Sequence, residues 1–245
     1  MDETTNFIND SGDSDASKVV VFAEDQTEAA GYAPQQSGYL PEVALNFINH
    51  SNDVNNSQVV IFAKNIATSF DELAVAWRVI QNCGQGWNHP FVYPMGQTIG
   101  ASDSWGNFTP QTDAPAGQAF AVQRAASGDQ LVAHGPATAP NEIQLLNALP
   151  QGAVSANIFK DGKLFATRTG IAPQQKAVFQ FKPTIWIGVV SQVEQGSVMN
   201  AAILSDVNTE ISLLGIASAD IVMTGGGAGP NALPFSFSLQ NVVMA

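Results

Sequence analysis

The chain carries one segment twice, and this repeat constrains the fold more than any other sequence feature. Residues 6–23 and residues 46–63 align at an offset of forty positions, and eleven of the eighteen aligned residues are identical. Each copy has a short β-prone start, a polar loop rich in Asn, Asp and Ser, and a final run of β-branched residues. This order predicts a strand–loop–strand unit, present once in each copy.

The segment between the two copies indicates how the chain is divided. Residues 24–43 mix Gly, Pro, Gln and Glu without periodicity, which is typical of a flexible linker. We therefore expect an acidic N-terminal repeat copy at 1–23, a linker at 24–43 and a β-rich globular domain at 44–245.

Several stretches of the globular part predict strands. Asp161 and Gly162 separate two alternating stretches, and this dipeptide favours a β-hairpin with a type I′ turn. The nearly continuous apolar run at 184–190 predicts a buried strand. Residues 235–243 begin with alternating apolar and polar side chains, as in a strand with one solvent-facing side.

Two other stretches are ambiguous in period. Residues 70–80 alternate and favour a strand, whereas residues 141–149 repeat apolar side chains every three positions and suggest one or two helical turns. Together, about ten strands with Gly- and Pro-rich turns predict an all-β fold, an antiparallel β-sandwich or barrel.

Charge and composition narrow the class of partner. The net charge is −12, yet residues 1–55 hold ten acidic side chains and one Lys, so most of the acidity is N-terminal. No cluster of Lys and Arg is present, which argues against nucleic-acid binding. Charged residues make up only 12% of the chain, and the resulting neutral, amide-rich surface suits packing against copies of the same chain.

The sequence contains no signal for a particular compartment. The N-terminus lacks the basic and apolar regions of a secretory signal, and no apolar stretch is long enough for a transmembrane helix. We expect a cytoplasmic protein by default, with export by a non-classical route left open.

Catalytic motifs are missing from the sequence. It has three histidines and one cysteine, and it contains no nucleophile elbow, HExxH helix, phosphate loop or CxxC pair. We therefore expect a protein that is not an enzyme and has no cofactor.

Four residues have the order of a blue-copper site. Cys83, His89 and Met95 follow one another at intervals of six, and His50 lies upstream. Cupredoxin-like sites use two histidines, a cysteine thiolate and a weak axial methionine. The spacing is loose and Pro90 directly follows the second histidine, so a small buried cysteine, a loop histidine and a core methionine are the favoured alternative.

The loop of the first copy offers carboxylates that suit calcium. Asp10, Asp13 and Asp15 have spacings that a Ca²⁺ site can use. The second copy keeps only Asp53 at the corresponding positions, so solvated turns are favoured over a metal site.

Three functions remain open. The leading one is a structural or self-assembling protein whose tethered first copy pairs where the second copy pairs, on its own or a neighbouring subunit, by adding strands to an open sheet edge. The second is a glycan- or surface-binding module that uses loops 84–115, with Trp87 and Trp105 stacking on sugar faces. A β-type membrane-active toxin is a minor alternative, made less favourable by the scarcity of basic residues.

Overall fold

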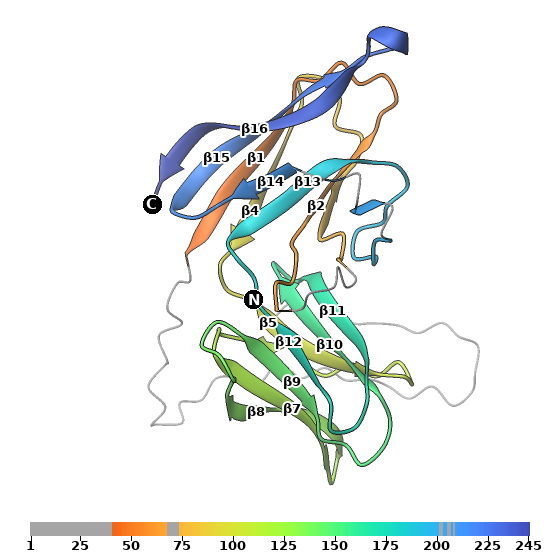
Figure 1. Cartoon of the computed structure of the whole chain (residues 1–245), viewed down its shortest axis with the longest axis vertical. Coiled ribbons are helices and arrows are strands. Elements are labelled where there is room, and N and C mark those ends of the chain that lie inside the picture. Colours follow the sequence, from red (N-terminus) through yellow and green to blue (C-terminus); the bar gives the residue numbers. More distant parts are fainter. Residues whose placement is uncertain (1–40, 68–73, 201–202, 205–206, 208) are drawn as a thin grey trace, which may run out of the picture. The chain divides into compact units, whose positions relative to one another are not determined.

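The structure is a computed structural model that describes residues 41–67, 74–200, 203–204, 207 and 209–245. All of these residues belong to one compact unit, Tyr39–Ala245. They form sixteen β-strands in four open sheets, so the prediction of an all-β sandwich fold is confirmed, with more strands than the roughly ten expected (Figure 1).

The first sandwich combines strands from both ends of the described chain. One sheet has the strand order β16-β15-β1-β4, and the other has the order β14-β13-β2-β3. The strands of this sandwich, called sandwich 1, are β1 (Glu42–Asn49), β2 (Gln58–Phe62), β3 (Arg78–Ile80), β4 (Asn88–Pro94), β13 (Thr184–Val190), β14 (Thr209–Ser212), β15 (Ile216–Gly226) and β16 (Leu233–Met244).

The second sandwich is inserted in the sequence between β4 and β13. Its sheets have the orders β11-β10-β5-β6 and β12-β9-β7-β8. The strands of this sandwich, called sandwich 2, are β5 (Thr98–Asp103), β6 (Thr112–Asp113), β7 (Gln118–Ala125), β8 (Gly128–Pro136), β9 (Ile143–Asn147), β10 (Val154–Lys160), β11 (Lys163–Ile171) and β12 (Lys176–Phe179).

Two of the sheets are mixed rather than purely antiparallel. β1 pairs in parallel with β15, and β7 pairs in parallel with β9. The remaining ladders between named strands are antiparallel.

Local sequence signals located several strands correctly. β10 and β11 form the predicted hairpin, with Asp161 at φ 50° and Gly162 at φ 66°, as a type I′ turn requires. The apolar run at 184–190 forms β13, whose bounds match the expected strand, and the alternating segment at 235–243 lies in β16.

The helical interpretation of residues 141–149 was wrong. Residues Ile143–Asn147 form β9, an inner strand between β12 and β7. Side chains on both of its faces are buried, so apolar residues at intervals of three do not mark a helical stripe here. The strand favoured for 70–80 is limited to Arg78–Ile80, preceded by isolated bridges at Ala74 and Val75; residues 70–73 lie outside the described part of the chain.

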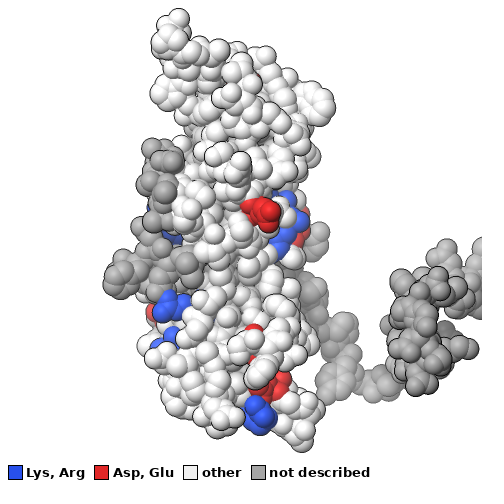
Figure 2. Space-filling model, turned by 90° about the vertical axis from the view of Figure 1, so that its right-hand side faces the viewer, with Lys and Arg blue, Asp and Glu red and all other residues white. Residues whose placement is uncertain are grey.

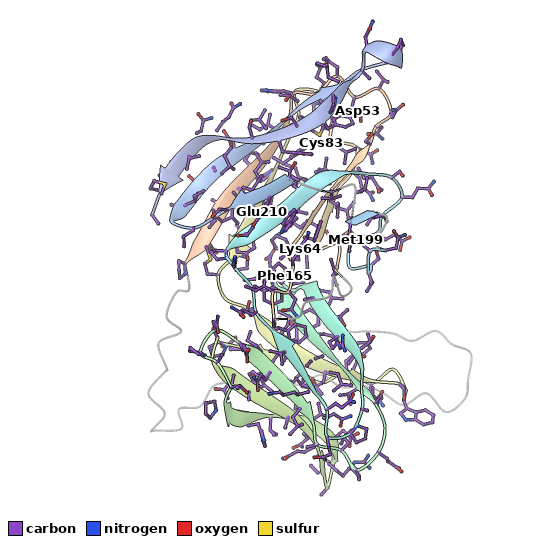
Figure 3. The ribbon with its side chains drawn as sticks, viewed as in Figure 1. Asp53, Lys64, Cys83, Phe165, Met199 and Glu210 are labelled. Atoms are coloured by element: carbon purple, nitrogen blue, oxygen red, sulfur yellow. The ribbon has the colours of Figure 1, made fainter. Side chains whose placement is uncertain are left out.

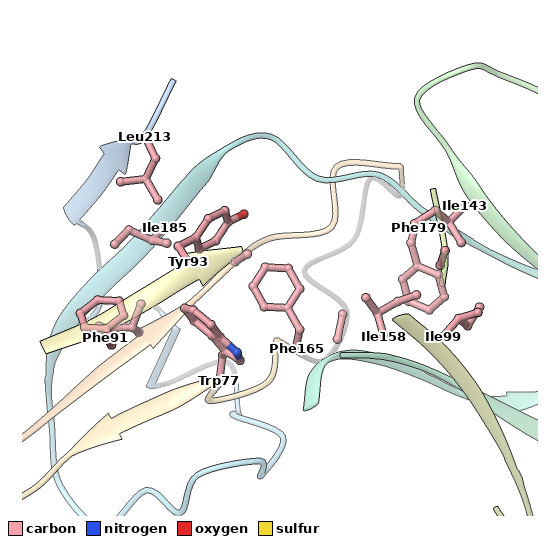
Figure 4. Packing of buried hydrophobic residues seen from close by; sticks show 14 of the residues in the cluster. Trp77, Phe91, Tyr93, Ile99, Ile143, Ile158, Phe165, Phe179, Ile185 and Leu213 are labelled. Atoms are coloured by element: carbon pink, nitrogen blue, oxygen red, sulfur yellow. The ribbon is translucent and has the colours of Figure 1, made fainter. Parts of the chain in front are cut away.

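Aromatic residues join the cores of the two sandwiches. Phe165 on β11 lies where the two sandwiches meet (Figure 3). Its ring lies edge-on to that of Trp77, with ring centroids 5.5 Å apart, and to that of Tyr93, at 6.2 Å (Figure 4). Phe165 also lies edge-on to Phe181, with ring centroids 5.0 Å apart. All of them belong to, or pack against, one hydrophobic cluster with side chains from all four sheets.

β2 is buried on both faces. Val59 and Ile61 face the main core, whereas Val60 and Phe62 face a smaller cluster that includes Val207. Close packing on that side also explains a glycine on the neighbouring strand β13, because a Cβ at position 188 would lie 2.8 Å from the side chain of Val207. Within the described residues, no helix is long and apolar enough to cross a membrane.

Candidate functional site

The second repeat copy forms a strand, a loop and a strand, but not a hairpin. Its first residues complete β1, its loop spans 50–57, and its last residues form β2. These two strands belong to different sheets of sandwich 1, so the copy links the two layers. The first copy, residues 6–23, lies outside the described residues.

Side-chain hydrogen bonds hold the loop of the second copy. The Asn49 side-chain oxygen accepts hydrogen bonds from the Ser51 backbone N–H at 2.9 Å and the Ser51 hydroxyl at 2.6 Å. The Asp53 carboxylate accepts from the Ser57 N–H at 2.6 Å and from the Asn55 N–H at 2.9 Å. Asn49 and Ser51 are buried, so these bonds satisfy polar groups that water does not reach.

The identities between the two copies follow burial in the second copy. None of the eleven positions identical in both copies is exposed in the second copy. Five positions of the second copy are exposed, and the first copy has a different residue at each of them: His50, Asn52, Val54, Asn55 and Asn56. The repeat therefore preserves the residues that pack and hydrogen-bond, and it varies those that face solvent.

The structure does not bring the four copper candidates together. His50 follows β1, and Cys83 lies beside this end of the strand, because the side chain of Asn49 donates to the Cys83 carbonyl at 2.6 Å. Met95 follows β4 at the opposite end of the β1–β4 ladder, which spans seven residue pairs. His89 pairs with Phe47, one pair from the end of the ladder near His50 and Cys83, so Met95 is the candidate that lies apart. A rise of about 3.4 Å per residue puts roughly 20 Å between Cys83 and Met95.

The protonation of Cys83 also disfavours a copper site. Burial raises the pKa of the Cys83 thiol, which opposes formation of the thiolate that copper requires. Burial and the positive charge of Arg78 lower the pKa of His89, which favours the neutral imidazole that metals bind, so His89 does not add to this argument. No group of three His, Cys, Asp or Glu side chains lies in ligand geometry in the part of the chain that the structure describes. Asp10, Asp13 and Asp15 lie outside that part.

The two candidate sugar-stacking tryptophans belong to different sandwiches. Trp87 precedes β4 of sandwich 1 and is 67% exposed, whereas Trp105 follows β5 of sandwich 2 and is 88% exposed. In the Trp105 loop, the Asp103 carboxylate accepts hydrogen bonds from the N–H groups of Trp105 and Asn107, both at 2.9 Å. Bonds from Asn107 lower the pKa of Asp103. Loops 84–115 therefore present separate aromatic sites.

A polar cavity of about 260 Å³ lies beside β9, β11 and β12 of sandwich 2. Lys176 Nζ donates to the Thr138 hydroxyl at 3.1 Å and to the Gln144 side-chain oxygen at 3.3 Å. The Gln144 amide donates to the Glu142 carboxylate at 2.6 Å. These groups satisfy one another, so a ligand entering the cavity must compete with bonds already made.

The junction between the sandwiches contains two buried cations. The indole N–H of Trp77 donates to the Lys160 carbonyl at 3.1 Å, and Arg78 forms an ion pair with Asp161 in the β10–β11 turn. The Arg78 guanidinium also lies over the ring of Phe91, 5.2 Å from its centroid. Strand β3 is thereby fastened to the hairpin turn of sandwich 2.

Lys160 also stabilises this junction, through hydrogen bonds to the backbone between β4 and β5. Its ammonium donates to the carbonyls of Pro94, Met95 and Gly96 at 2.6, 3.1 and 3.2 Å, and it lies 4.7 Å from the ring centroid of Tyr93. Burial lowers the pKa of Lys160 to about 7. A cavity of about 210 Å³ adjoins it, but all three donors of the ammonium are used by the carbonyls. Lys160 therefore clamps the connection from β4 to β5.

The sheet edges of the described body differ in how they are protected. Four of the eight edge strands, β3, β6, β12 and β14, have four residues or fewer. Of the longer ones, β4 contains two prolines, β8 an aspartate and a proline, and β11 a lysine and an arginine. Short length, charge and proline are the usual devices against edge-to-edge pairing. β16 has twelve residues and no charged side chain; it has one proline near its start, and the β15–β16 ladder shifts register near both ends, leaving a regular stretch in the middle.

β16 is the outer strand of its sheet (Figure 1), and apolar side chains at both of its ends are exposed. Leu233, Val243 and Met244 are 67%, 54% and 65% exposed. Figure 2 shows few charged side chains on one face of the molecule and none over its uppermost part. An uncharged, partly apolar edge of this length is the feature of the described body best suited to binding a further strand.

Comparisons with protein-family profiles, with curated proteins and with solved structures found no match for this chain. The functional conclusion therefore depends on the geometry of the chain itself.

Proposed function

We propose that the protein is a non-enzymatic, self-assembling structural protein in which residues 6–23 of one subunit bind a sheet edge of a neighbouring subunit. The observation that carries this proposal is the match between repeat identity and burial. A duplicated ligand loop would keep its exposed residues, whereas a duplicated packing element keeps its buried ones.

The first copy contains the side chains that need a partner surface. Val20 and Phe22 correspond to Val60 and Phe62, which are fully buried in the second copy. An isolated pair of strands cannot cover apolar side chains on both faces. Burying a Val or Phe side chain contributes about 1.5–3 kcal/mol, so contact with a second subunit stabilises this segment.

The first copy cannot occupy the position that the second copy fills in the fold. β1 lies between β15 and β4, and β2 lies between β13 and β3, so the second copy has no free edge beside it. The first copy therefore cannot pair where the second copy pairs, and it needs a different acceptor edge. Exchange of the copies is also disfavoured, because Val43 and Leu45, 1% and 2% exposed, correspond to Glu3 and Thr5.

The linker and the surface suit such an assembly. Because β1 begins at Glu42, the chain between the first copy and the folded body is residues 24–41 rather than 24–43. A flexible chain of these eighteen residues has a root-mean-square span of about 23 Å, which is enough to reach an adjacent subunit. With only 12% charged residues, repulsion between the folded bodies is weak.

A pair of double variants tests the proposal. We expect Val20→Asp with Phe22→Asp to reduce the assembled mass measured by light scattering and to remove assemblies seen by electron microscopy. The matched control is Ser14→Asp with Ala16→Asp, which adds the same charge at positions whose counterparts Val54 and Asn56 are exposed. Equal masses for both double variants and the unchanged chain would refute the proposal.

The loop of Trp105 favours a second candidate, a glycan-binding surface. Trp105 is 88% exposed and Phe108 is 75% exposed, and Phe108 lines a cavity of about 120 Å³ with Asp103 and Asn107. Exposed aromatic faces beside amides suit sugar binding. A glycan array should then show binding that Trp105→Ala abolishes and Trp87→Ala leaves unchanged. Binding that is indifferent to Trp105→Ala contradicts this candidate.

A further inference from the structure

We infer that two copies of this chain pair through their β16 strands, antiparallel about a two-fold axis, and join their four-stranded sheets into one continuous sheet. This inference rests on the proposed self-assembly and names a contact that does not involve the N-terminal repeat. The contact is an isologous one, in which the same strand contributes from both sides.

The face pattern of β16 is complementary to itself. Phe235, Phe237 and Leu239 pack against the core, while the serines between them face solvent. A second β16 added at this edge continues the apolar row on one side and the polar row on the other. A strand with a different pattern would place apolar side chains on the wet face.

Two-fold symmetry restricts the register. With Ser238 opposite its own equivalent, Phe237 lies opposite Leu239 of the other copy, and Ser236 lies opposite Gln240. In each pair both residues are apolar or both are polar, so one face of the joined sheet stays apolar and the other stays polar. The five consecutive residue pairs between β15 and β16 from Asp220 to Thr224 keep the strand regular over this part.

The ends of β16 support the same arrangement. In an antiparallel pair, Leu233 of one copy approaches the Val242–Met244 end of the other. These residues are among the most exposed large apolar side chains of the described body. The pairing therefore covers apolar surface at both ends of the contact.

The first repeat copy fits this edge less well than a second β16. Its run Val19–Phe22 has four consecutive apolar residues and no polar alternation. Beside Ser238, two of these side chains would face water. That segment needs an acceptor covered on both faces, whereas β16 needs a strand with one polar face.

Placing a charge at Ser238, on the two-fold axis, tests the β16 pairing. The experiment uses the full chain carrying Val20→Asp and Phe22→Asp, so that any role of the first copy is disabled. In this background we expect a dimer by light scattering, and Ser238→Lys or Ser238→Glu alone should reduce the mass to one chain, 25.8 kDa. Mixing the Lys and Glu variants should restore the dimer, because opposite charges then face each other.

Gln123→Lys is the matched control, since it places a lysine at an exposed position of the inner strand β7. It should leave the dimer unchanged, and circular dichroism should show that all variants fold. A dimer that survives both Ser238 variants, or a mixture that stays monomeric, overturns the inference. If Ser238→Lys lowers the assembled mass of the chain with an intact first copy, but Val20→Asp with Phe22→Asp does not, the proposed role of the repeat is refuted and the β16 contact is supported.

Discussion

Replacing Lys160 by Met tests the energetics of the junction. Lys160 is 3% exposed, and its ammonium donates to three backbone carbonyls between β4 and β5. Methionine has a similar length and no charge. The substitution therefore removes one buried titratable group while keeping most of the volume.

The sign of the pH dependence follows from the direction of the shift. Burial lowers the pKa of Lys160 to about 7 in the folded protein, from the ordinary 10.5 of an exposed lysine. Between these pH values the unfolded chain holds a proton that the folded chain has released, so stability rises with pH. The cost of the buried charge is fully present below pH 7 and is gone above pH 10.5.

The magnitude has an upper bound. Each pH unit between the two pKa values changes the free energy of unfolding by at most about 1.4 kcal/mol, or about 5 kcal/mol over the whole interval. The three carbonyl acceptors favour the ammonium, so we expect a rise below this bound.

Denaturant unfolding at pH values from 6 to 10 measures this effect. The quantity of interest is the free energy of unfolding of the unchanged chain minus that of Lys160→Met, in which the other titrations cancel. We expect this difference to rise with pH. Lys182→Met, at an exposed position, controls for the loss of a lysine. A difference that is flat or falls over this range would refute the reasoning.

Three further substitutions test the packing. Gly225→Ala should cost about 3 kcal/mol or more in the free energy of unfolding, because its φ is +89° and a Cβ there would lie 2.1 Å from the Pro234 carbonyl oxygen. As a control, Gly84→Ala, where a Cβ would meet no atom within 4 Å, should change the free energy of unfolding by no more than about 0.5 kcal/mol. Asn147→Ala should cost about 2–4 kcal/mol in denaturant unfolding, because it removes the donor that now contacts the buried Ile171 carbonyl at 2.8 Å and the Gly152 carbonyl at 2.9 Å. Phe165→Leu should cost about 1–2 kcal/mol and reduce the near-ultraviolet circular dichroism of the aromatic junction. A stable Gly225→Ala, or an unchanged aromatic signal for Phe165→Leu, would contradict the packing described.

Local signals in the sequence predicted local structure well. The Asp161–Gly162 turn and the strand at 184–190 depend on residues that are adjacent in the chain, so both could be predicted. The segment 141–149 could not, because burial of β9 on both faces depends on β7 and β12, which pair with it from elsewhere in the chain. The existence of two sandwiches likewise depends on long-range pairing.

The candidate sites show the same division. The alternation of β16 is visible in the sequence, but its position at a sheet edge is not. The order of His50, Cys83, His89 and Met95 suggested copper, yet the β1–β4 ladder separates Cys83 from Met95. The junction lysine had no sequence signal, because its three carbonyl partners lie more than sixty positions away.

The insertion of sandwich 2 has a consequence for how the chain folds during synthesis. β1 is made early, but its parallel partner β15 lies about 174 residues later, as the bond between Asn46 and Asp220 shows. At about 5–20 residues per second, the ribosome needs roughly 10–35 s to supply that partner. Sandwich 2, whose strands are contiguous in the sequence, is complete before then. We therefore expect the inserted sandwich to fold first and to serve as the support on which the two ends of sandwich 1 meet.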